Sequence, residues 1–372
     1  MNQQKDVFIA ADNIVSPIGM TTAENFAQLR MGVTGVRRHE RPEMSDQPFY
    51  ASLFDAYPGG PGTIFENLLA SSIADTLSRT PSISVKDDRT ILILCSTKGN
   101  IYLLDTDPQT APERISLPGS AEVLARHFGL VHPPMVVSNA CISGLLGMIT
   151  GMRLLRSGLF ENVIVTGADV ITKFILSGFG SFQALSAGHC RPFDRDRDGI
   201  NLGEAAGTVI LTTNREYRHG LRLRGGAVSN DANHISGPSR TGRELGDAIE
   251  KALKDAGCVA GDIGFISAHG TATAYNDEME ARAISLAGLE HVPVNSLKGY
   301  YGHTLGAAGL IESIVTLQSM RESLVLPSRG FGHNGVTTPL NVCASLVETP
   351  LTTCLKTASG FGGCNAAVIL GK

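Results

Sequence analysis

Two stretches decide the fold: residues 135–169 read MVVSNACISGLLGMITGMRLLRSGLFENVIVTGAD, and residues 292–328 read VPVNSLKGYYGHTLGAAGLIESIVTLQSMRESLVLPS. Each runs from a short apolar strand pattern through a glycine-bearing elbow into a helical pattern, and then to another strand. Each also places a reactive residue, Cys141 or His303, where the helix is expected to begin. The similarity lies in the pattern more than in identity, and it suggests a duplicated fold.

Short apolar runs recur along the rest of the chain. They are VFIAA (7–11), ILILC (91–95), MVVSN (135–139), VIVTG (163–167), GFISA (264–268) and AAVIL (366–370). Because longer helical patterns separate them, they predict an α/β architecture whose strands are buried on both faces. The least regular part, at about 100–120, contains several Asp and Pro residues. We expect it to be a long surface excursion.

Composition narrows the class of protein. The 372 residues include 31 basic and 35 acidic ones, so no positive field favours a nucleic-acid partner. The 7 cysteines show no CxxC pair and no metal-like spacing, which favours a reduced, cytoplasmic compartment. The N-terminal apolar run is interrupted by Asp12 and Asn13, and no stretch of about 20 apolar residues follows, so neither a signal peptide nor a membrane span is expected.

Cys141 is the first candidate catalytic residue. The helix expected after it is apolar nearly all round and should be buried, with Ile142, Leu145, Leu146, Met148, Ile149, Met152, Leu154 and Leu155. The first turn of a helix offers unpaired N–H groups and partial positive charge, which favour a thiolate. We therefore expect a cysteine pKa below its usual ~8.5 and a nucleophilic sulfur at neutral pH. The alternative is an inert, buried cysteine that only packs.

Three further segments carry chemistry. In ISAHGTATAYND (266–277), His269 follows a strand, where a crevice forms at the carboxyl edge of a sheet. NSLKGYYGHTLGAAGLIE (295–312) adds His303 and small residues that permit close backbone approach, and SGFGGCNAAVIL (359–370) has glycines that leave N–H groups free for an anion. Each segment alone could be structural: a capping histidine, a packed helix pair, a plain turn. Together they favour a catalytic site.

The blocks NACISG, HGTATAYND, KGYYGHTLGAAG and SGFGGCN resemble the signatures of β-ketoacyl-acyl-carrier-protein synthases of the Cys-His-His type. So do VFIAADNIVSPIG and RPFDRDRDGINLGEAAGTVIL, and the resemblance covers nearly the whole chain in the family's order. It implies a thiolase-like α/β fold of two similar halves in five alternating αβαβα layers, usually dimeric. Residues 1–215 would carry the nucleophile, and residues 216–372 the two histidines.

The resemblance also implies roles for individual residues. Cys141 would accept the acyl group, and His269 and His303 would stabilise the enolate formed when malonyl carrier loses carbon dioxide. The backbone N–H groups of Cys141 and Phe361 would form the oxyanion hole, and the Phe361 ring would gate the acyl pocket. The remaining matched positions are Lys298, Glu312 and Asp277, which support the histidines, Thr271 and Thr273, which hold the pantetheine arm, and Phe179, which lines the pocket.

The implied activity is that of a 3-oxoacyl-carrier synthase, an acyltransferase catalysing decarboxylative Claisen condensation in fatty-acid or polyketide-like biosynthesis. Acyl carrier protein would be a partner. The only prosthetic group would be the phosphopantetheine of the carrier, and the resemblance implies no metal. The chain would form a homodimer or a heterodimer with a related subunit. One alternative is a silent, chain-length-determining subunit, although such relatives usually lose the cysteine. Another is a degradative thiolase using Cys364, which stands where the family has threonine; the two histidines favour the synthase.

One further departure from the family concerns the length of the chain. The chain is shorter than typical members of the family, mostly before Cys141, in regions that shape the dimer contact and acyl tunnel. Neither the acyl length nor the pairing of subunits follows from the sequence.

The run from Asp194 to Gly199 imitates the start of a calcium loop, but Ala205 occupies the position of the required glutamate, and arginines interleave with the acids, so we expect no calcium site.

Overall fold

Every apolar run identified above forms a strand in the computed structural model, which describes residues 5–107, 109–232 and 237–372. Ten strands form one mixed sheet in the order β11-β10-β14-β15-β9-β1-β8-β6-β4-β5. The N-terminal five are β1 (Phe8–Val15), β4 (Thr90–Cys95), β5 (Met135–Val137), β6 (Asn162–Asp169) and β8 (Ala205–Thr212). The C-terminal five are β9 (Arg222–Asn230), β10 (Phe265–Ser267), β11 (Val294–Asn295), β14 (Thr353–Gly360) and β15 (Cys364–Gly371).

The two groups of strands share one topology. β1 and β8 are antiparallel, as are β8 and β6, while β6, β4 and β5 run parallel. The same sequence of directions relates β9, β15, β14, β10 and β11. Between β1 and β9 the groups pair at only one position, Phe8 with Arg222. This repeat agrees with a duplicated fold; the division of the chain at residues 215 and 216 stays a prediction.

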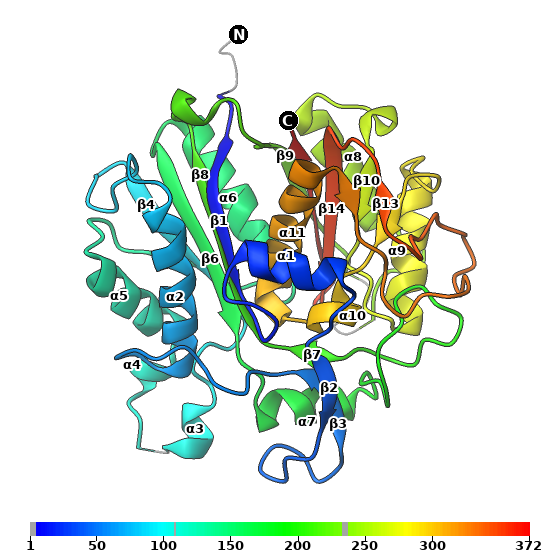
Figure 1. Ribbon diagram of the computed structural model, residues 1–372, viewed down its shortest axis with the longest axis horizontal. Coiled ribbons are helices and arrows are strands. Elements are labelled where there is room, and N and C mark those ends of the chain that lie inside the picture. The colour runs from blue at the N-terminus through cyan, green and yellow to red at the C-terminus, as the bar shows by residue number, and fades with distance from the viewer. Residues whose placement is uncertain (1–4, 108, 233–236) are drawn as a thin grey trace.

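Helices sandwich the two groups of strands (Figure 1). α2 (Ile64–Ser78) and α5 (Leu117–Phe128) cover the outer face of the N-terminal strands, and α8 (Arg243–Ala256) and α9 (Ala274–Leu286) cover the outer face of the C-terminal strands. α6 (Ser143–Ser157) and α11 (Ala308–Glu322) lie between them and contact strands of both groups. The layers are therefore αβαβα, which confirms the predicted thiolase-like fold.

The central layer is close-packed because glycines line the contact between its two helices. A Cβ added at Gly144 of α6 would lie 2.8 Å from the Cβ of Leu310 on α11, and one at Gly309 would lie 3.2 Å from the Cβ of Leu145. The apolar residues expected to bury α6 lie in the core or pack against it, as predicted. The two helices thus meet at nearly backbone distance.

The remaining elements are short or peripheral. They are α1 (Thr22–Arg30), α3 (Leu103–Thr106), α4 (Pro112–Ile115), α7 (Lys173–Ser181), α10 (Lys298–Tyr301), η1 (Arg215–Tyr217), η2 (Ala260–Asp262), η3 (Leu305–Ala307), β2 (Val36–His39), β3 (Phe49–Ser52), β7 (Leu202–Gly203), β12 (Leu324–Val325) and β13 (Val347–Glu348). The excursion expected at 100–120 instead contains α3, α4 and the start of α5, because Pro112 and Pro118 occupy first-turn positions that tolerate proline. Within the described ranges, no helix is both long and apolar enough to cross a bilayer.

Candidate active site

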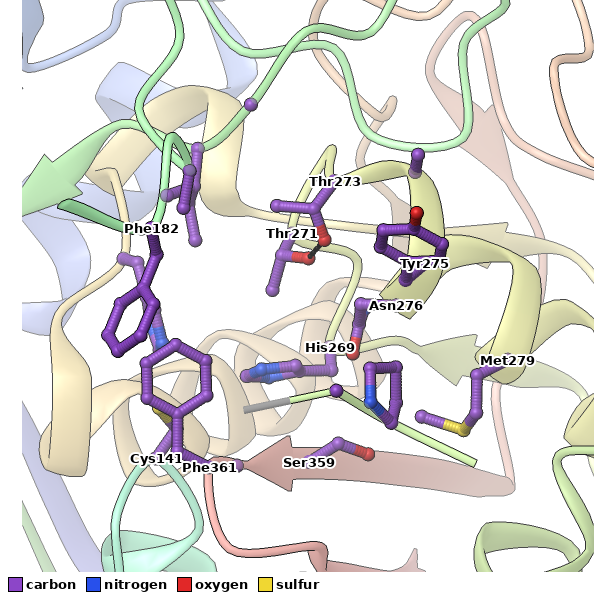
Figure 2. Close-up of a pocket in the computed structure, with 18 of the residues that line it drawn as sticks. Cys141, Phe182, His269, Thr271, Thr273, Tyr275, Asn276, Met279, Ser359 and Phe361 are labelled. Atoms are coloured by element: carbon purple, nitrogen blue, oxygen red, sulfur yellow. Dashed lines mark hydrogen bonds between the residues drawn. The ribbon is translucent and has the colours of Figure 1, made fainter. Parts of the chain in front are cut away.

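Cys141, His269 and His303 line one cavity of about 480 Å³ (Figure 2). They come from three loops: Cys141 follows β5 in the N-terminal group of strands, His269 follows β10, and His303 follows β11 and α10. Because β10 and β11 are parallel neighbours, their carboxyl ends lie at the same edge of the sheet. The central layer brings the cysteine of the other group to that edge.

Cys141 stands in a tight elbow between β5 and α6. The preceding residue, Ala140, has φ +43°, a conformation that only a constrained non-glycine residue adopts. Ser143 constrains it, since its Oγ accepts the N–H of Asn139 at 2.8 Å and donates to the carbonyl of Ala140 at 2.7 Å. The elbow holds the sulfur, 8% exposed as a residue, at the cavity wall.

The predicted thiolate is wrong for this resting site. Burial raises the pKa of the Cys141 thiol to about 12, and nearby Cys364 and Asp169 raise it further, while Lys298 and the backbone N–H of Phe361 act in the opposite direction. Desolvation therefore outweighs the favourable effect of the start of the helix. The thiol is neutral at rest and must release its proton when it attacks.

His269 and His303 form a buried pair whose ring centroids lie 5.2 Å apart at an interplanar angle of 82°. Burial lowers the pKa of both imidazoles well below 6.5, and the cations Lys298 and Lys356 lower both further; for His269, His303 adds to the effect. A neutral imidazole carries one N–H donor and one acceptor nitrogen. The pair can therefore offer two hydrogen bonds to one oxygen in the cavity, or accept a proton there.

Buried charges fix the backbone at His269. The Glu280 carboxylate accepts the N–H of His269 at 2.8 Å and that of Gly270 at 2.7 Å. Lys298 Nζ donates to the carbonyl of His269 at 2.9 Å and forms an ion pair with Glu312. Lys298 thus lies beside His269, and Glu312 lies beside Lys298; the supporting roles that the resemblance implies for them stay predictions.

Two charged residues beside the histidines escaped the sequence analysis. Glu280 lies one helical turn after Asp277 on α9, and that i, i+3 spacing of acids was the available signal. Lys356 lies in central strand β14 and forms an ion pair with Glu312 at 2.6 Å. Its signal was a lone lysine in the otherwise uncharged run LTTCLKTASG (351–360).

Asp277 supports the loop that follows His269 rather than a histidine directly. Its carboxylate accepts the N–H of Thr271 at 3.0 Å and that of Phe193 at 2.7 Å. Burial raises the pKa of Asp277 to about 7, although the hydrogen bond from the N–H of Phe193 opposes the shift. The loop carries Thr271 and Thr273, whose hydroxyl oxygens lie 2.8 Å apart and face the cavity (Figure 2).

Phe361 stands at the cavity mouth between two other aromatic rings. It stacks on Phe179 at 5.7 Å and meets Phe182 edge-on at 5.4 Å, so Phe182 joins the predicted pair. A Cβ at Gly360 would lie 2.9 Å from the backbone nitrogen of Cys141, so glycine is what lets this loop reach the elbow. Cys364 is buried beside the loop, with Sγ 3.4 Å from the carbonyl oxygen of Phe361.

Acidic residues in the run from Asp194 to Gly199, which imitates the start of a calcium loop, accept hydrogen bonds from other protein groups. Asp194 accepts the backbone N–H groups of Asp196, Gly332 and His333, and Asp198 accepts the hydroxyl of Ser186. Among the residues that the structure describes, no three His, Cys, Asp or Glu side chains are grouped as a metal site would require.

A thiolase-like fold that presents one cysteine and two histidines to a common cavity defines the class of thiol-dependent condensing enzymes. Two family models extend this: "Beta-ketoacyl synthase, N-terminal domain" matches residues 104–216, and "Beta-ketoacyl synthase, C-terminal domain" matches residues 221–332. The chain belongs to the beta-ketoacyl synthase family.

Named relatives agree. The chain is 34% identical over 265 residues to 3-oxoacyl-[acyl-carrier-protein] synthase 2 of Vibrio cholerae, an alignment covering 65% of this chain and 63% of that protein. It is 29% identical to the Rhizobium meliloti protein of the same name over 420 residues, covering 98% of each chain. It is 32% identical over 265 residues to the tetracenomycin polyketide synthase ketoacyl synthase alpha subunit of Streptomyces glaucescens, covering 67% of this chain and 62% of that one.

Solved structures extend the likeness over the whole chain. The ishigamide ketosynthase/chain length factor matches with a TM-score of 0.90 and 27% identity, covering 100% of both chains. A ketosynthase in complex with its chain length factor from Xenorhabdus doucetiae matches with a TM-score of 0.88 and 26% identity, covering 99% of this chain and 98% of that one.

Proposed function

We propose that this protein is a 3-oxoacyl-carrier synthase that joins a Cys141-bound acyl group to a malonyl unit with loss of carbon dioxide. The observation that carries the proposal is the joint placement of one thiol and two neutral, buried imidazoles around a single cavity. Acyl transfer needs the thiol, and decarboxylation needs donors for the negative charge that develops on a thioester oxygen.

In the first half-reaction, Cys141 Sγ bonds to the acyl carbonyl carbon and the carrier's C–S bond breaks. The proton of the neutral thiol goes through an imidazole of the cavity to the departing pantetheine sulfur. The carbonyl oxygen, negative in the tetrahedral intermediate, accepts hydrogen bonds from the backbone N–H groups of Cys141 and Phe361. The Phe361 N–H already faces the sulfur in the resting site.

In the second half-reaction, the bond between the malonyl α-carbon and its carboxylate breaks, and carbon dioxide leaves. The electron pair forms an enolate, whose oxygen accepts the N–H groups of His269 and His303. The α-carbon then attacks the acyl-Cys carbonyl, the C–S bond to Cys141 breaks, and the thiolate takes up one proton from solvent water. The product stays on the carrier as a 3-oxoacyl chain extended by two carbons.

The proposed partners follow from this chemistry. The substrates are acyl carrier proteins, and the phosphopantetheine belongs to the carrier, with Thr271 and Thr273 beside the path of its arm. A second, related subunit is proposed because two similar structures pair a ketosynthase with a chain length factor. A homodimer and a heterodimer are both compatible with the fold. The free cysteines fit a cytoplasmic site of action.

Mass spectrometry after incubation with acyl carriers of graded length tests the proposal. We expect an acyl adduct on Cys141, with the preferred length indicating the substrate, and no adduct on Cys141→Gln at that peptide. If no adduct forms under conditions in which the protein complex condenses malonyl carrier, the chain is the silent, length-determining subunit instead.

A further inference from the structure

We propose that Lys356 is a positioning residue for the histidine pair: together with Lys298 it places two ammonium groups at the end of β10, where they fix the backbone that carries His269. The catalytic consequence of this inference rests on the proposed function. The inferences about the position and the charge of the histidines do not rest on the proposed function, because both can be measured on the histidines themselves.

The first argument is where the ammonium of Lys356 reaches. Lys356 is fully buried in β14 and pairs with Ser267 of β10. Its Nζ donates to the carbonyl of Ser267 at 3.2 Å and to that of Ala268 at 3.0 Å. Lys298 Nζ donates to the next carbonyl, that of His269, at 2.9 Å. Three consecutive carbonyls leading into the catalytic loop therefore accept lysine N–H groups, which fixes the path of the backbone that carries the imidazole.

The second argument is how the charges are paired. One carboxylate, Glu312, lies between the two ammonium groups, with Oε1 against Lys298 and Oε2 at 2.6 Å from Lys356. All three side chains are at most 4% exposed. A buried lysine that only packed would carry a large desolvation cost without return. Here Glu312 offsets part of that cost for both lysines. Each ammonium keeps a positive charge that can stabilise negative charge near it.

Three charged groups act on Lys356, and they come from three helices. They are Glu312 of α11, Lys298 of α10 and Glu280 of α9. Glu280 is engaged by the N–H groups of His269 and Gly270 and by the Thr357 hydroxyl at 2.6 Å. Burial lowers the pKa of Lys356, and Glu312 opposes that shift. Both lysines act on both imidazoles in one direction, toward the neutral form.

The consequence for chemistry is twofold. A neutral imidazole can accept the Cys141 proton during acyl transfer, which a protonated one cannot. The same two ammonium groups stay fixed on the carbonyls of residues 267–269 when the enolate forms, and fixed positive charge stabilises the enolate without reorganisation. Lys356 touches neither substrate, so it acts through His269 and His303.

The direct test is an NMR titration of histidine-labelled protein, with His269→Gln and His303→Gln used to assign the ring signals. Lys356→Met keeps the length of the side chain and removes its charge. We expect the midpoints of His269 and His303 to rise by about one pH unit. Lys254→Met, an exposed lysine of α8, is the matched control and should leave both midpoints unchanged.

A double variant separates charge from packing. Lys356→Met combined with Glu312→Gln removes one positive and one negative charge, so the midpoints should return toward those of the wild type. The acid limb of the pH profile for malonyl-carrier decarboxylation should follow the same pattern, moving to higher pH in the single variant.

Unchanged midpoints in a folded Lys356→Met variant, with a rate loss equal at every pH, would overturn the proposal. If that variant does not fold, Lys356→Gln, which keeps a donor for Ala268, replaces it with the same expected rise. Wild-type protein without any decarboxylation would refute the proposed function alone, since the titration still reports on Lys356.

Discussion

The two elbows of the molecule, β5 to α6 and β11 to α11, have the same topology but different buried charged groups beside them. Beside the N-terminal elbow lies Asp169, which is buried and accepts N–H groups from Thr97, Lys98 and Gly306. Beside the C-terminal elbow lie Lys298 and Lys356. Burial is the largest cause of both pKa shifts: it raises the pKa of the thiol, to which Cys364 and Asp169 add, and it lowers the pKa of the imidazoles, to which Lys298 and Lys356 add. The repeat gives both elbows the same backbone plan, and the buried charged groups make their surroundings different.

The largest expected effect is a loss of condensation without a loss of decarboxylation, caused by a change in the N-terminal elbow alone. Cys141→Gln should reduce condensation by about 10⁴-fold or more, because no sulfur remains to carry the acyl group. Decarboxylation of malonyl carrier should persist, since the C-terminal elbow is intact. Release of carbon dioxide and formation of the 3-oxoacyl product, measured in parallel, check this. Loss of both activities in a folded variant would contradict the division between the elbows.

The next effect concerns the other elbow. His303→Ala should slow decarboxylation by about 10²- to 10³-fold, the usual cost of removing one donor from a site that stabilises an oxyanion. Acylation of Cys141 by acyl carrier, followed by mass spectrometry, should continue. Decarboxylation at the wild-type rate would show that the enolate oxygen does not accept a hydrogen bond from this residue.

The smallest expected effect is at Cys364. Cys364→Ser should change condensation by less than about tenfold, because a hydroxyl can donate to the same carbonyl oxygen, that of Phe361, and one neutral hydrogen bond contributes about 1 kcal/mol. Steady-state kinetics with acyl and malonyl carriers provide the measurement. A larger loss, accompanied by cleavage of 3-oxoacyl thioesters by coenzyme A in the wild type, would support the thiolase alternative.

Local patterns predicted much of the fold and the membership of the site. The strand runs and the apolar helix after Cys141 are short-range signals, and each survives in the structure. The glycines at 306 and 309 correctly indicated close backbone approach. Cys141, His269 and His303 were identifiable because each follows a strand at an elbow, and the roles assigned to them stay predictions until they are measured.

What the sequence could not provide depends on the surroundings of each residue in space. The start of a helix at Cys141 was visible, but the desolvation that raises its pKa was not. Lys356 occupies a strand position that in an exposed sheet would point to water; only the sheet order, with β14 covered by neighbours on both edges and α11 against it, shows that the lysine is buried.

The glycine-lined contact of α6 with α11 has a consequence for how the chain can be taken apart. Each helix covers the inner face of its own strands and also packs closely against the other along Gly144 and Gly309. Cutting the polypeptide between the repeats would strip an entire apolar face from each fragment. Such fragments would be expected to precipitate separately and to regain structure only when mixed, because each needs the apolar face of the other to be covered.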